Sequence, residues 1–136
     1  MTSQPEKRDM PLSPHLQIYK PQMTSILSIL HRGTGVVLYF GTLLFVLWLT
    51  LLSSGPESYA CAKSWLKSPI GYLFLMGWSF SLFYHLANGI RHLAWDLGHG
   101  YDLKTAENSG KIVIICAISF SVFSWALGFV WGKIWS

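Results

Sequence analysis

The stretch GTGVVLYFGTLLFVLWLTLLSSGP, from Gly33 to Pro56, contains no Asp, Glu, Lys or Arg. Two more uncharged stretches follow it, from Ser68 to Ile90 and from Ile112 to Gly132. Each is at least as long as the roughly 20 residues that a helix needs to cross the hydrocarbon core of a bilayer. The sequence therefore predicts an all-α membrane protein with three transmembrane helices, preceded by a short N-terminal interfacial helix.

The composition supports lipid as the surrounding medium. Of the 136 residues, 51% are hydrophobic and only 12% are charged, about half the charged fraction of a typical soluble domain. A soluble three-helix chain of this length has no core large enough to bury all three uncharged stretches. We expect one membrane-anchor domain over residues 1–136, with an extended segment over 1–23 and helical membrane segments over about 24–53, 69–97 and 109–132.

We interpret the net charge of +4 as a result of membrane topology and not as a sign of a nucleic-acid partner. Most basic residues precede the first helix or flank the second connection: Lys7, Arg8, Lys20, Arg32, Arg91, Lys104 and Lys111. Fewer lie in the first connection, expected to be a loop from Ser54 to Lys67. The positive-inside rule then places the N-terminus and the loop from Leu97 to Gly110 on the cytoplasmic or matrix side. Thr24 or Ser25 is expected to be the N-cap of the first helix, and Gly98 and Gly100 suit the end of the second.

The second uncharged stretch ends in a polar motif, HLANGIRHLAWDLG, which begins at His85. At 3.6 residues per turn, Gly89, His92 and Asp96 share a stripe with His85, each within about 40° of it. Arg91 points about 120° away and is expected to meet a different partner. Gly89 leaves room where a flat ligand could lie along the helix.

Two interpretations are open for each histidine of this motif. His85, well inside the uncharged stretch, is either a haem iron ligand or the donor of an interhelical hydrogen bond, because a histidine buried in a membrane needs a partner. For His92, nearer the surface, a headgroup or capping contact competes with a role in a site. A six-coordinate haem needs two axial ligands, and only His31 in this chain could join His85. The second ligand is therefore expected from another subunit.

A second polar cluster, Ser28, His31 and Arg32, lies at the matching depth before the first uncharged stretch. His31 and Arg32 could neutralise haem propionates through charge-assisted hydrogen bonds, and the Ser28 hydroxyl could bind a quinone carbonyl. Taken alone, Arg32 could simply extend to lipid headgroups. Two polar clusters at one depth favour a shared cofactor site.

Three motifs together resemble the family of succinate dehydrogenase cytochrome b556 subunits, the larger membrane anchors of respiratory complex II. They are PLSPHLQIY from Pro11, SILHRGTG from Ser28 and HLANGIRHLAWDLG from His85. The family patterns Ser-x-x-His-Arg-x-Ser/Thr and His-x-x-x-Gly-x-Arg-His are met in full. Met10 stands where the family usually has Arg, which puts any role of that arginine in doubt here.

The resemblance implies that His85 is an axial ligand of one haem b shared with a second, smaller membrane anchor. It further implies that His31 and Arg32 approach the haem propionates and that Ser28 and Arg32 line the ubiquinone pocket. The family motif also includes supporting residues without an assigned role: Gly89, Arg91, His92 and Asp96.

The implied function is that of a non-catalytic anchor subunit of the succinate dehydrogenase enzyme, in a bacterial or mitochondrial inner membrane. Its implied partners are a flavoprotein, an iron–sulfur subunit and the smaller anchor, and electrons would pass from succinate to ubiquinone in respiration and the tricarboxylic acid cycle. Two alternatives stay open: a cytochrome b anchor of another redox complex, such as a hydrogenase or formate dehydrogenase, and a non-redox structural membrane subunit.

Overall fold

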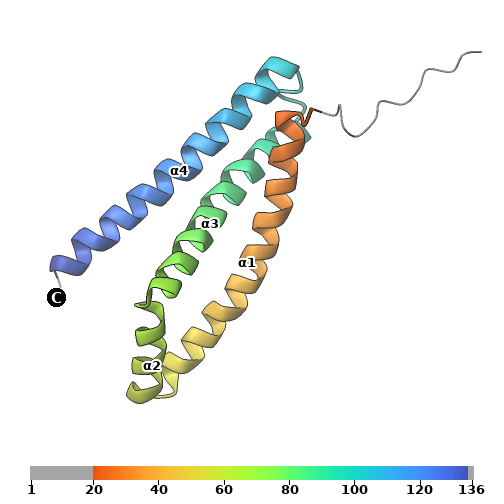
Figure 1. The fold of residues 1–136 in the computed structure, drawn as a ribbon. Coiled ribbons are helices and arrows are strands. Elements are labelled where there is room, and N and C mark those ends of the chain that lie inside the picture. Colours follow the sequence, from red (N-terminus) through yellow and green to blue (C-terminus); the bar gives the residue numbers. More distant parts are fainter. Residues whose placement is uncertain (1–19, 135–136) are drawn as a thin grey trace, which may run out of the picture.

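The computed structural model describes residues 20–134, and this part of the chain is helical apart from short connections (Figure 1). The helices are α1 (Met23–Ser53), α2 (Pro56–Leu66), α3 (Pro69–Asp96) and α4 (Leu103–Ile134). Three of them, α1, α3 and α4, are long and apolar enough to cross a membrane. The expected all-α fold with three membrane helices is confirmed. Most of the expected extended segment 1–23, with the motif from Pro11 to Tyr19, lies outside the described residues.

The interfacial helix expected before the first span is the N-terminal part of α1 and is continuous with the span. Gln22, in extended conformation, is the N-cap, and its carbonyl accepts the backbone N–H groups of Ser25 and Ile26 at 3.0 and 3.1 Å. The N-cap expected at Thr24 or Ser25 is therefore wrong. The helix opens on a backbone carbonyl, with no side-chain cap.

The first connection contains α2, a helix where a loop was expected. Its signals are in the sequence: Pro56 begins it, Glu57 lies in its first turn and Lys63 in its last turn. These positions suit proline's fixed φ and the helix dipole. Gly55, just before it, has φ +120°, a conformation that L residues rarely adopt.

The second connection is shorter than expected, because α4 begins at Leu103 and not near Ser109. The Asp102 carboxylate accepts the backbone N–H of Thr105 at 3.0 Å, which is an N-cap contact. Hydrogen bonds from the side chain and backbone of Thr105 lower the pKa of Asp102. Gly98 and Gly100 have φ of +81° and +83°, in agreement with their expected role in ending α3.

Helix α3 lies between α1 and α4, and the three meet most closely at one end (Figure 1). The buried apolar cluster there contains Leu27, Tyr84, Val113 and Ala117. The Tyr84 hydroxyl donates to the Leu27 carbonyl at 2.9 Å, and a side chain at Gly110 would collide with Leu27. Close approach of α4 to α1 therefore fixes the N-terminal turns of α1 against the second half of α3, where both polar motifs lie.

Candidate functional site

The imidazole of His85 lies where the two polar motifs meet, and its hydrogen-bond partners assign its tautomer. Nδ1 of His85 lies 3.1 Å from the carbonyl oxygen of His31 and 3.3 Å from Oγ1 of Thr34. A carbonyl oxygen can only accept, so Nδ1 carries the proton and donates it. Nε2 is then an unprotonated nitrogen, and it has no hydrogen-bond partner within residues 20–134. This is the arrangement typical of a histidine that binds a metal through Nε2.

His31 packs face to face on His85, with ring centroids 3.9 Å apart and an interplanar angle of 10°. It also contacts His92, with centroids 5.1 Å apart. Nδ1 of His31 is buried and has no hydrogen-bond partner among the residues that the structure describes. A buried polar atom of this kind is rare without a partner, so the site has an unused hydrogen-bonding group beside His85.

Ser28 and Arg32 of α1 and Arg91 and His92 of α3 line one cavity of about 410 Å³. The structure thus brings together the two polar clusters that the sequence placed at one depth. The rest of the lining is Thr24, Ser25, Ile29 and Trp95. No carboxylate is among these lining residues, so two guanidinium groups make the cavity electropositive.

Arg91 is 6% exposed and points away from His85, toward α4, as its helical angle predicts. Its guanidinium donates to Ser109 Oγ at 3.0 Å, to the Ala106 carbonyl at 2.9 Å and to Asn88 Oδ1 at 3.3 Å. It also lies over the Trp95 ring, 4.0 Å from the centroid, a favourable cation–π distance. These contacts anchor the polar end of α3 to the first turns of α4.

Gly89 and Asp96 lie apart from this cluster. A side chain at Gly89 would meet no atom within 4 Å, so the space expected beside it is open in this chain. Asp96 is exposed and does not line the cavity.

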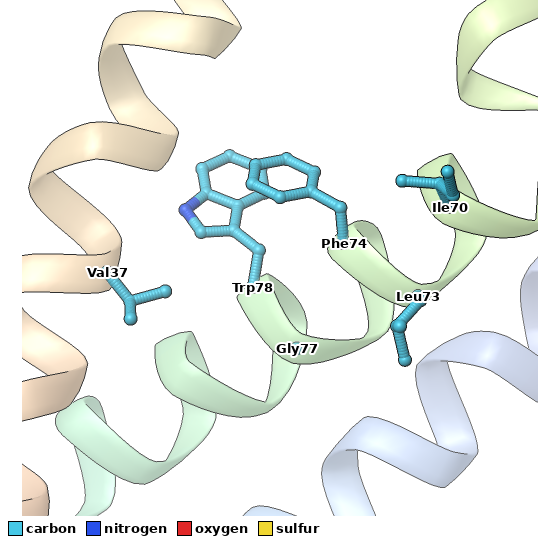
Figure 2. A pocket seen from close by; sticks show the side chains of 6 residues that line it. All are labelled: Val37, Ile70, Leu73, Phe74, Gly77 and Trp78. Carbon is cyan, nitrogen blue, oxygen red and sulfur yellow. The ribbon is translucent and has the colours of Figure 1, made fainter.

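A second hollow, of about 340 Å³, lies between α1 and α3 farther along the bundle (Figure 2). Its lining is Val37, Ile70, Leu73, Phe74, Gly77 and Trp78. None of these residues titrates or carries a charge, so this hollow has no group for acid–base chemistry. The cavity of Ser28 and Arg32 is therefore the candidate site.

Comparison with known proteins gives the family of this chain. Residues 6–124 match the family model described as succinate dehydrogenase/fumarate reductase transmembrane subunit. The chain belongs to this family.

Several relatives are named as subunits of succinate dehydrogenase. The succinate dehydrogenase cytochrome b556 subunit of Rickettsia prowazekii (strain Madrid E) is 45% identical over 115 residues, covering 85% of this chain and 90% of the relative. The subunit of the same name from Paracoccus denitrificans is 37% identical over 120 residues, covering 88% and 92%. The mitochondrial succinate dehydrogenase cytochrome b560 subunit of Sus scrofa is 43% identical over 114 residues, covering 82% and 68%.

In this succinate dehydrogenase/fumarate reductase family member, Gly35 and Asn88 contact site residues but were not predicted from the sequence. Gly35 lies against the His85 ring, since an added Cβ would come within 3.1 Å of Cε1. Asn88 is fully buried between Arg91 and His92. A buried Asn one turn after His85 was a possible signal, because an amide in a membrane helix needs partners.

Proposed function

We propose that this chain is the larger membrane anchor of a succinate:quinone oxidoreductase, and that it holds one haem b jointly with a smaller anchor and forms part of the quinone reduction site. The observation that carries the proposal is the cavity that Ser28, Arg32 and His92 line, next to the stacked pair of His31 and His85. The names of the relatives, cytochrome b subunits of succinate dehydrogenase, agree with it.

The residues around His85 fit a haem. His85 would hold the haem iron through its free Nε2, because its Nδ1 donates to a backbone carbonyl that fixes the orientation of the ring. The buried, unpartnered Nδ1 of His31 can donate to a propionate, and Arg32 can add a charge-assisted bond. A bound haem b supplies a one-electron redox centre at this end of the bundle.

The second axial ligand is proposed to come from the smaller anchor. The rings of His31 and His85 stack on one another at 3.9 Å, so a haem would not fit between them. His31 is therefore assigned to the propionates and not to the iron.

The quinone is assigned to Ser28 and Arg32. The Ser28 hydroxyl can donate to a carbonyl oxygen, and the Arg32 guanidinium stabilises negative charge that develops on a quinone oxygen during reduction. The absence of carboxylates from the described lining favours that charge.

We propose that the complex reduces quinone at one surface of the membrane. A flavoprotein oxidises succinate and an iron–sulfur subunit passes the electrons to the quinone at the cytoplasmic or matrix face of an inner membrane. The positive-inside distribution of Lys and Arg supports placing the N-terminus and the site on that side.

The substitution Arg32→Ala tests the quinone assignment in the assembled complex. We expect succinate–quinone activity to fall at least tenfold, because a charged hydrogen bond to the quinone is lost. Succinate oxidation with a soluble dye acceptor should be unchanged, since the dye does not use this cavity. Lys104→Ala, which removes a positive charge from an exposed residue at the same end, is the matched control and should leave both activities intact.

Equal loss of both activities in Arg32→Ala would mean that the soluble subunits no longer assemble on the anchor. Full quinone activity in this variant would refute the assignment of Arg32.

A further inference from the structure

A buried amide of α3 joins the side chains of Arg91 and His92. Asn88 is 0% exposed. Its Oδ1 accepts from Arg91 at 3.3 Å, and its Nδ2 lies 3.3 Å from Nε2 of His92. Arg91 is itself fixed by Ser109 and by the Ala106 carbonyl of α4.

This chain of contacts has only one consistent direction. A guanidinium has donors and no acceptor, so the oxygen of Asn88 must face Arg91. The amide nitrogen then faces His92 and can only donate. Turning the amide over would set donor against donor on the Arg91 side. Arg91 therefore fixes the orientation of the Asn88 amide.

The orientation of Asn88 in turn fixes the tautomer of His92. Because Asn88 donates to Nε2, this nitrogen must be unprotonated, and the single proton of the neutral imidazole is on Nδ1. Within residues 20–134, Nδ1 of His92 has no hydrogen-bond partner and is not among the buried polar atoms. The ring lines the cavity that Ser28 and Arg32 also line.

We propose that Asn88 and Arg91 are positioning residues that hold His92 as its Nδ1–H tautomer, so that His92 donates a third hydrogen bond to a quinone oxygen beside Ser28 and Arg32. The inference rests on the proposed quinone site. The acceptor is assigned as quinone because His92 lines the cavity with Ser28, for which the quinone is the only proposed partner.

Two substitutions of His92 separate the two ring positions. Asn places an amide N–H near the position of Nδ1, whereas Gln reaches the position of Nε2. In the assembled complex we expect His92→Gln to raise KM for a short-chain quinone about tenfold, the effect of one lost hydrogen bond. His92→Asn should keep KM within about threefold of wild type. His99→Gln, at an exposed histidine of the same end, is the control and should leave KM unchanged.

A double-mutant cycle tests Asn88. We expect Asn88→Ala to raise KM about fivefold when His92 is present, because the proton of His92 is then free to move to Nε2. In the His92→Asn background the same change should alter KM less than twofold, since no tautomer remains to be set. A merely structural role of Asn88 would give equal effects in both backgrounds, and that result would overturn the proposal.

The outcomes also separate this inference from the proposed quinone site. Dye-linked succinate oxidation and the haem spectrum report assembly for every variant. If Arg32→Ala abolishes quinone reduction while His92→Gln leaves KM unchanged, only the role of His92 fails. If Arg32→Ala has no effect, the quinone site itself is wrong. Loss of haem with an unchanged KM in His92→Gln would place His92 on the propionates and overturn the assignment.

Discussion

At the level of single residues, His85 and His92 of α3 differ in which ring nitrogen their hydrogen-bond partners leave free. His85 donates from Nδ1 to a backbone carbonyl, which leaves Nε2 as an electron-pair donor. His92 accepts at Nε2 from Asn88, which leaves Nδ1–H as a proton-bearing donor. The first arrangement suits an iron and the second suits a carbonyl oxygen. The chemistry of each histidine thus depends on its hydrogen-bond partners, which the spacing of residues along α3 does not predict.

The ligand role of His85 is tested by the dithionite-reduced absorption spectrum of the purified complex. We expect His85→Ala to abolish or strongly reduce the b-type band, because this variant has no imidazole at the axial position. His99→Ala, at the same end of α3 but exposed, is the control and should retain the full band. A band that survives His85→Ala undiminished would contradict the assignment.

At the level of helices, the first residue of a helix depends on capping side chains and prolines, which a hydropathy pattern does not show. Helix α4 starts several residues before the uncharged stretch that indicated it, because Asp102 caps its first turn. Helix α2 forms in a polar connection where proline and the helix dipole favour it. The first turn of α4 and helix α2 both lie at ends of the membrane spans, where polar side chains and water can form hydrogen bonds with backbone groups.

We expect Asp102→Ala to speed amide hydrogen exchange in the first turn of α4, because Thr105 loses its acceptor. Asp102→Asn is the matched control and should change exchange little, since Asn is also a good N-cap. The pKa of Asp102 is lowered in the folded protein. The ionised carboxylate therefore stabilises the helix at pH values above the usual Asp range, and this contribution is lost as the pH falls through the lowered pKa. Equal exchange rates in Asp102→Ala and wild type at neutral pH would contradict the capping role.

At the scale of the whole molecule, the buried interior is small and lies mainly at one end. Large apolar side chains along all three spans are exposed, for example Ile29 at 68%, Leu73 at 73% and Phe129 at 61%. Exposure on this scale is unfavourable in water but suits lipid and the faces of partner subunits. Helix α2, which contains Cys61, lies at the opposite end of α1 from the N-terminal turns of α1 (Figure 1).

The proposed orientation predicts which end reacts with a membrane-impermeant maleimide in sealed vesicles. In a Cys116→Ser background, Cys61 should react in right-side-out vesicles, because it is exposed on α2. A Cys61→Ser, His99→Cys variant in the same background should react only in inside-out or permeabilised vesicles. The reverse pattern would place the site on the outer face.

The three spans could be predicted from the sequence, and so could the positions of the two polar clusters along them. A segment without charges that is long enough to cross a bilayer must satisfy its backbone hydrogen bonds internally, and a helix is the structure that does so within one segment. The position of a residue along such a helix then follows from its number.

Which polar atoms meet could not be predicted from the sequence and follows from the packing of the helices. The stacking of His31 on His85 and the path from Ser109 through Arg91 and Asn88 to His92 depend on how each helix is rotated about its axis and how closely it approaches the next. Those rotations are set by local packing, such as Leu27 against Gly110, and lipid-facing side chains leave them undetermined. The linear pattern therefore predicted where the two polar clusters lie along their helices, and helix packing brought them to one cavity.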